Sequence, residues 1–182
     1  MHCPKCLQYM IVLCVLVCHA CGCSRINKSR ECQLPKNIAD YIAANYPNMR
    51  TRTIDDLSKD DKMFWSKFSN SECPGMVKGY FQNDKVIDIA VLIVPREKQQ
   101  KGFKVIVFTI GEGGYTVTTV LDADQSSSLG QVIHKTKPGT YTDAEGKQID
   151  IQRDGIVIEK IESAATIYYW NGREYMSVDS ND

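Results

Sequence analysis

The stretch of residues 73–94, CPGMVKGYFQNDKVIDIAVLIV, constrains the fold of this chain more than any other. It is the longest apolar region after the N-terminus, and a turn-prone Asn-Asp pair divides it into segments 77–82 and 86–94. Two apolar, β-branched segments on either side of such a pair predict a β-hairpin. The second segment is apolar except for Asp88, which predicts a central strand that is covered on both faces.

From residue 73 to the C-terminus the apolar residues follow a period of two, which is typical of β-strands. Gly113 and Gly114 join two segments in a further hairpin, and Asn171 and Gly172 join the last two. Because no helical pattern lies between the segments, parallel βαβ units are not expected. The further expected strands are residues 103–110, 115–121, 132–133, 149–151, 156–161, 166–170 and 173–178.

Helical patterns precede this region. Ile38, Tyr41 and Ile42 recur at the i, i+3, i+4 spacing of one helix face, in a segment that Pro47 ends. A second helix is predicted over residues 58–68, which begin with a serine that can cap the first turn.

These elements together predict an α+β fold, with two N-terminal helices packed on an antiparallel β-meander sheet or sandwich. A chain of 182 residues suits one ordinary hydrophobic core. We therefore expect a signal peptide over residues 1–22 and a single α+β domain over residues 23–182.

The first 22 residues have the pattern of a secretory signal peptide. Lys5 lies in a short start, an apolar run covers residues 10–18, and small residues follow. The apolar run is too short to span a bilayer, which takes about 20 helical residues. This pattern indicates export rather than a transmembrane anchor.

Residues 20–23, ACGC, resemble the lipobox of bacterial lipoproteins, in which a cysteine after small residues is acylated and becomes the mature N-terminus. The resemblance implies lipidation of Cys23, with Cys21 as the alternative. If Cys23 is acylated, Cys32 and Cys73 remain as an even pair that an oxidising envelope would join in a disulfide. If Cys21 is acylated, Cys23 is left over.

The charges are balanced, with 22 basic and 22 acidic residues that do not cluster. Proteins that bind nucleic acid or an anionic membrane surface carry basic patches. We therefore expect no nucleic-acid partner, and contact with the membrane through the lipid anchor only.

The sequence offers no catalytic constellation. His134 is the one histidine after residue 22, and no nucleophile or zinc motif such as GxSxG or HExxH surrounds it. Nothing in the spacing of the acidic residues picks out a catalytic pair. We expect no catalytic residue, no enzyme activity, and no cofactor other than a possible calcium ion.

The loop at residues 80–88 resembles the calcium loop of FG-GAP or integrin-type repeats, which runs DxNxDGxxD into an apolar strand. Asp84 and Asp88 fall on its fifth and ninth positions, whereas its first aspartate and its glycine are replaced. Calcium takes about six to eight oxygen ligands, so the resemblance implies a site formed by Gln82, Asp84 and Asp88. In the alternative, Asp84 makes an Asx-type turn and Asp88 accepts backbone N–H groups, and the loop is a structural corner.

Three segments together resemble small bacterial envelope lipoproteins: CPG before the first strand, YFQNDKVIDIAVLIV, and SAATIYYWNGREYMSVDSND at the C-terminus. The resemblance implies a lipid-anchored protein of the bacterial cell envelope, periplasmic or in the outer membrane. The expected function is non-catalytic binding of another protein, such as inhibition of, or immunity against, a toxin or cell-wall hydrolase. The alternative is a calcium-stabilised structural or adhesion module.

Aromatic residues gather in the last hairpin, where alternation directs Tyr168 and Trp170 to one face and Tyr169 to the other. Surfaces that bind proteins are enriched in Tyr and Trp. Tyr168, Trp170 and Tyr175 are therefore candidate partner-binding residues. The alternative is that these rings pack against one another across the strands.

Overall fold

The computed structural model describes residues 32–69, 73–97, 99–124, 130–161 and 163–180. Strands hold 47% of these residues. The helical elements are short: α2 (Lys36–Asn45), the 3-10 turn η2 (Ile54–Asp56) and α3 (Lys59–Phe68). None of the helices in the described ranges is long and apolar enough to cross a membrane.

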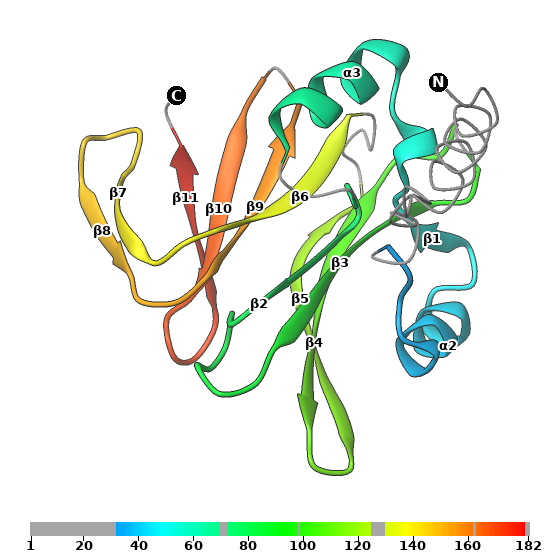
Figure 1. Cartoon of the computed structure of the whole chain (residues 1–182), viewed down its shortest axis with the longest axis horizontal. Helices are drawn as coiled ribbons and strands as arrows, with labels where there is room; N and C mark the ends of the chain where they lie inside the picture. Colours follow the sequence, from blue (N-terminus) through cyan, green and yellow to red (C-terminus); the bar gives the residue numbers. More distant parts are fainter. Residues whose placement is uncertain (1–31, 70–72, 98, 125–129, 162, 181–182) are drawn as a thin grey trace, which may run out of the picture. The chain divides into compact units, whose positions relative to one another are not determined.

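The larger sheet has five antiparallel strands around β3 (Figure 1). On one side of β3 lies β4, followed by β5 at the edge; on the other side β1 and β2 lie end to end. Every residue of β3 is buried, which confirms the predicted central strand. The strands are β1 (Met49–Thr51), β2 (Met76–Gly79), β3 (Asp88–Pro95), β4 (Phe103–Gly111) and β5 (Gly114–Ala123).

The second sheet has four antiparallel strands in the order β11-β10-β9-β6. It faces the larger sheet, and residues from both sheets form one buried cluster between them. On one side a hydrogen bond joins the two sheets: the Ile133 N–H of β6 donates to the Pro74 carbonyl just before β2 (2.9 Å). The strands are β6 (Gln131–Thr136), β9 (Gly155–Lys160), β10 (Ala165–Trp170) and β11 (Tyr175–Ser180).

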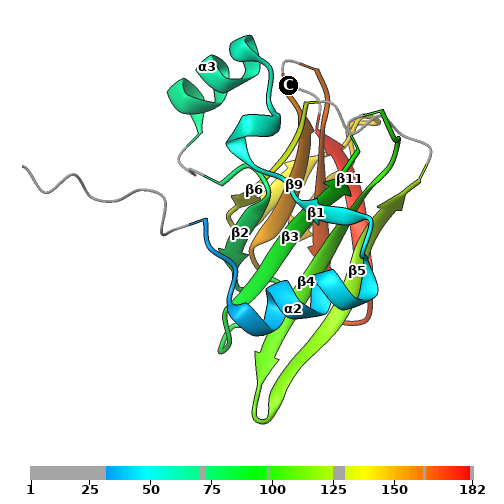
Figure 2. The same ribbon diagram turned by 90° about the vertical axis from the view of Figure 1, so that its right-hand side faces the viewer.

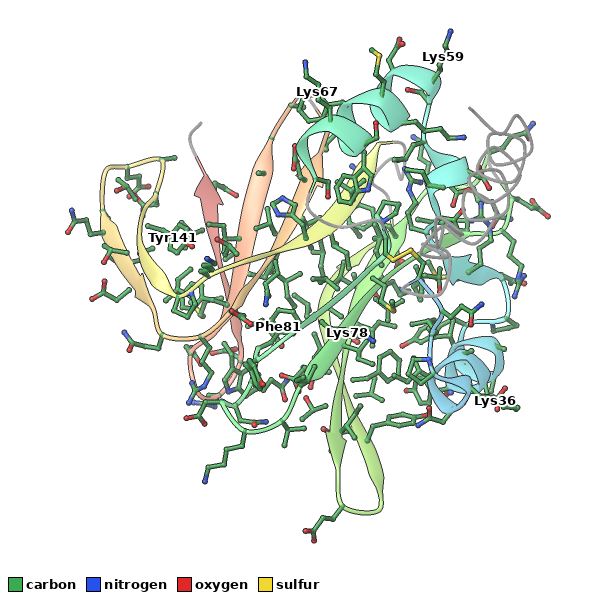
Figure 3. The ribbon with its side chains drawn as sticks, viewed as in Figure 1. Lys36, Lys59, Lys67, Lys78, Phe81 and Tyr141 are labelled. Carbon is green, nitrogen blue, oxygen red and sulfur yellow. A yellow bond between two sulfur atoms is a disulfide. The ribbon has the colours of Figure 1, made fainter. Side chains whose placement is uncertain are left out.

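A two-stranded ribbon, β7 (Gly139–Thr142) with β8 (Gln148–Ile151), connects β6 to β9. Tyr141 of β7 points toward the four-stranded sheet (Figure 3) and packs on a cluster that contains Val157, Ile167 and Val178. The ribbon therefore covers the face of this sheet that is turned away from the larger sheet. Only the C-terminal strand of this ribbon was expected from the sequence.

The predicted fold class, α+β with two N-terminal helices packed on a β-meander, is wrong: the described chain is mainly β. Both predicted helices exist, but each has 10 residues and they do not form a shared layer on one sheet. Ile38 and Ile42 of α2 join the cluster on the outer face of the larger sheet. Trp65 of α3 instead joins a separate cluster with Leu57 and Val132.

The reason for this error is that local patterns report where a helix forms but not what it covers. The N-cap of α3 is as predicted, since the Ser58 hydroxyl accepts the Asp61 N–H (3.1 Å). The meander is also incomplete, because β6 pairs with β9 across the intervening ribbon. Contacts between segments that are distant in sequence decide which surface each helix covers and which strands pair.

The described residues belong to one unit, Glu31–Asp182. The predicted signal peptide and the candidate lipidation residues Cys23 and Cys21 lie outside the described residues. The predicted boundary at residue 22 and the acylated cysteine therefore stay predictions.

Candidate functional site

The predicted disulfide between Cys32 and Cys73 is present, with the two Cα atoms 5.3 Å apart (Figure 3). Cys73 is buried in the cluster that α2 forms with the larger sheet. The bond links the segment before α2 to the start of β2.

The connection between β2 and β3, residues 80–87, is the loop that resembles a calcium site. Asp88 follows it and is 0% exposed. Its Oδ2 accepts the N–H groups of Phe81 (3.0 Å) and Gln82 (2.8 Å), so the carboxylate binds the loop's own backbone. This arrangement is the structural corner that was the alternative to a metal site.

The turn inside the loop is made by Asn83 rather than by Asp84. The Asn83 Oδ1 accepts the N–H groups of Lys85 (3.0 Å) and Val86 (2.7 Å), which is an Asx-type turn. The Asp84 side chain lies in the exposed part of the loop. The prediction of an Asx-type turn was correct in kind but assigned to the wrong residue.

A second carboxylate, which no sequence motif singles out, supports the same loop. Asp154, just before β9, accepts the Tyr80 N–H at Oδ2 (2.9 Å) and lies 3.3 Å from the Lys135 ammonium. Three consecutive backbone N–H groups of the loop are thus taken by two carboxylates from opposite sheets. The only sequence signal for Asp154 was a polar residue beside the start of a strand.

Gln82 links the loop to the next hairpin through its side chain. Its Oε1 accepts the Thr109 hydroxyl of β4 (3.0 Å), and its Nε2 donates to the Thr118 hydroxyl of β5 (3.1 Å). The amide of Gln82 is therefore occupied by two threonines, one from each strand of the hairpin.

Two buried polar atoms lie beside this bridge, Oδ1 of Asp88 next to Thr109 and the hydroxyl of Tyr175 next to Gln82. Burial raises the pKa of the Asp88 carboxyl, although the Gln82 N–H opposes the shift. Burial, and then the negative charge of Asp88, raise the pKa of Tyr175. The two groups therefore lie near each other in a poorly solvated interior.

The three residues of the predicted calcium site do not come together as a donor set. Gln82 and Asp88 are engaged in the contacts above, and Asp84 is exposed. Within the described ranges, no group of three or more His, Cys, Asp or Glu side chains could hold a metal ion. The donor chemistry of the loop thus fits backbone support better than calcium coordination.

The aromatic residues of the last hairpin alternate between faces as expected. Tyr168 and Tyr175 pack against the cluster between the two sheets, whereas Tyr169 packs under the β7–β8 ribbon. Trp170 lies opposite Tyr175 in the strand register, and their rings meet edge to face at 5.2 Å. This geometry favours the alternative of cross-strand packing, with Tyr168 and Tyr175 contributing to the core.

His134 of β6 lies beside the neighbouring strand β9, where its Nε2 is 3.1 Å from Glu159 Oε2. This pair is a partly exposed cross-strand contact. Among the described residues, the partner of the His134 ring is thus a carboxylate.

Exposed apolar side chains gather at one end of the two sheets. Figures 1 and 2 show the β2–β3, β4–β5 and β10–β11 connections emerging at the end opposite α3. We call Tyr80, Ile87 and Ile110, the exposed apolar residues in and beside the β2–β3 and β4–β5 connections, the loop-end surface; each is between 42% and 47% exposed. Met176, beside the β10–β11 connection, is 41% exposed but lies on the face of the second sheet that carries Tyr169. The sequence does not mark these residues, because alternation alone does not separate them from core positions.

Comparison of the chain with protein-family models, curated proteins and solved structures finds no match.

Proposed function

We propose that the protein is a non-catalytic lipoprotein of the bacterial cell envelope that binds another protein through the loop-end surface. Its most concrete form is an inhibitor or immunity protein directed against a secreted toxin or a cell-wall hydrolase. The lipid on Cys23 would hold the domain at the membrane and leave its loops free to meet such a partner.

The observation that carries this proposal is the gathering of apolar side chains at one end. Among the described residues, three of the six large hydrophobic side chains with marked exposure belong to the loop-end surface. Single exposed apolar residues are ordinary, but residues that gather in one region are typical of protein contacts. The remaining three, Ile54, Met63 and Met176, lie in η2, α3 and β11.

Hydrogen bonds hold the β2–β3 connection in place, which supports binding. Asp88, Asp154 and Gln82 hold the β2–β3 connection from both sheets. A preordered loop loses little conformational entropy when a partner binds.

The test uses the purified chain as bait in an envelope and culture extract. We expect one dominant protein to be retained, and Ile87→Ser with Ile110→Ser to weaken its binding at least about tenfold. The matched control is Met63→Ser with Ile54→Ser, which removes as much exposed apolar surface away from the loops and should bind like wild type.

The inhibitor form has its own test. The retained protein, purified separately, should lose lytic or toxic activity when the wild-type chain is added, and a strain that lacks the chain should become sensitive to it. Equal binding by both double variants, or the absence of any specific partner, would reject the loop-end surface as the binding site.

A further inference from the structure

Strand β5 forms a free edge of the larger sheet. It pairs with β4 along its length, and no other described strand lies beside it in the sheet order. With 10 residues, it is the longest strand of the described chain. An edge strand of this kind presents a row of N–H and C=O groups with which another extended backbone can pair.

β5 carries two features that discourage such pairing, Asp122 and a β-bulge between Thr119 and Leu121, and both lie in its C-terminal half. β1 and β2 are short and contain Arg50 and Lys78, β6 contains Lys135, and β11 contains Asp179. Residues 113–121 of the β5 edge hold no charged residue and no proline. Charged residues and prolines on edges are the usual protection against edge-to-edge pairing.

The regular part of β5 is residues 115–119, because a β-bulge follows Thr119. Tyr115 and Val117 pack on the α2 side of the sheet. Thr118 lies on the opposite face, where it meets Gln82. Because side chains alternate along a strand, Thr116 lies on the same face as Thr118. Thr119 lies on the same face as Tyr115 and Val117.

This segment is self-complementary in an antiparallel register centred on Val117. Val117 then faces Val117 of a second copy, Thr116 faces Thr118, and Tyr115 faces Thr119. Directly opposite residues share a face of the combined sheet, so each of these pairs joins residues from the same side. Within residues 115–119 no charged residues face each other, and a two-fold axis closes the pairing.

We propose that two copies of this chain associate through β5, antiparallel and centred on Val117, to form one continuous ten-stranded sheet. The occupant of the free edge is thus a second copy of the same strand. The inference is independent of the partner of the loop-end surface, which lies on different residues.

The first test is the mass of the full chain in detergent by light scattering after size-exclusion chromatography, with the micelle mass subtracted. We expect a dimer at micromolar concentration. Thr116→Lys places a charge on the free edge and should raise the dimer dissociation constant at least about tenfold. Its control is Thr142→Lys, an exposed threonine of β7, which should leave the dimer intact.

The second test reads the register and does not depend on weakening the dimer. In the proposed register, the Cα atoms of Val117 and its symmetry mate are about 4.5 to 5.5 Å apart, which suits a disulfide. Val117→Cys should therefore form a covalent dimer with oxidised glutathione. Thr119→Cys lies on the same strand and is more exposed, but it is too far from its own mate to do so.

Circular dichroism of each variant establishes that it is folded. A wild-type chain that remains monomeric up to about 100 μM would overturn the proposal, as would a monomer that pairs only with a foreign strand. Two results together would also overturn it: a dimer dissociation constant that Thr116→Lys leaves unchanged, and a yield of disulfide-linked dimer that is no higher for Val117→Cys than for Thr119→Cys.

Discussion

At the scale of single residues, the β2–β3 connection is held by carboxylates that accept backbone N–H groups. Asp88 takes two such groups and Asp154 takes one. A buried carboxylate is costly unless hydrogen bonds compensate it. Here the N–H groups of the loop supply that compensation, since the loop cannot continue the ladder between β2 and β3.

We expect Asp88→Ala to lower the free energy of unfolding by about 3 kcal/mol, because two backbone N–H groups lose their acceptor in the interior. Asp88→Asn keeps an acceptor oxygen and should cost less. Urea denaturation measures both. The control is Asp84→Ala, which removes an exposed carboxylate and should have no effect.

The same variants test the calcium resemblance. Because the loop's donors are engaged with the backbone, we expect the melting temperature of the wild type to be the same in calcium and in chelator. A calcium-dependent rise that Asp84→Ala and Asp88→Ala both abolish would contradict this interpretation.

Asp56 gives a prediction for the dependence of stability on pH. Burial would raise the pKa of Asp56, but the Arg50 guanidinium and the Thr53 N–H outweigh it and lower the pKa from 3.8 to about 2. Arg50 Nη1 lies 2.6 Å from Asp56 Oδ2. Because the folded-state pKa is depressed, the stabilisation is present above pH 3.8 and is lost as the pH falls toward about 2.

We therefore expect Asp56→Asn to lower the free energy of unfolding at pH 7 by about 1 kcal/mol, a value reduced for the partial exposure of the pair. The difference from wild type should shrink between pH 4 and pH 2. Thermal melts across that range measure it, and a difference that stays constant with pH would contradict the assigned role of the charge.

At the scale of elements, β1 and β2 share one edge of β3 and meet at Gly75. The Arg52 N–H donates to the Leu92 carbonyl (3.0 Å), and the Leu92 N–H donates to the Gly75 carbonyl (2.9 Å). A Cβ at Gly75 would lie 2.2 Å from the Arg52 carbonyl oxygen. Only glycine permits this approach, so the chain can place two short strands along one long strand.

Gly75→Ala should lower the free energy of unfolding by at least about 3 kcal/mol, because the clash is with backbone and cannot be relieved by a rotamer change. Gly111→Ala is the matched control, since a Cβ added at Gly111 would meet nothing within 4 Å. Chemical denaturation of both variants makes the comparison, and equal stability would show that β1 and β2 can separate without cost.

At the scale of the whole molecule, the Cys32–Cys73 disulfide and the contact between β2 and β6 tie distant parts of the chain together. The disulfide spans a sequence separation of 41 residues. It attaches the segment before α2 to the strand that adjoins both sheets. The bond thus holds the chain just before α2 next to the start of β2.

Reduction should lower the free energy of unfolding by about 4 kcal/mol, the chain-entropy value for a loop of this length. Melting of the Cys32→Ala, Cys73→Ala double variant should match that of the reduced wild type. Intact mass before and after reduction measures the bond directly and also shows whether the chain starts at an acylated Cys23. A double variant as stable as the oxidised wild type would contradict this contribution.

Much of the local structure follows from the sequence by itself. The fully apolar run around Leu92 predicts the buried central strand, Ser58 predicts the start of α3, and the count of cysteines predicts the disulfide. Each of these signals depends on neighbours in the chain or on residue type alone. Local physical chemistry is therefore enough to determine them.

The tertiary structure alone decides how these parts combine. It makes Met49–Thr51 and Gly139–Thr142 into strands, which local patterns did not predict, because each gains its ladder from a partner distant in the chain or across a turn. It recruits Asp154 to a loop 74 residues away, and it directs Oδ2 of Asp88 to the backbone N–H groups of that loop. Local sequence patterns indicate most of the strands, because side-chain alternation depends on chain neighbours alone. Only the long-range pairing of backbone groups and buried faces determines which strands are neighbours, and so the mainly β fold.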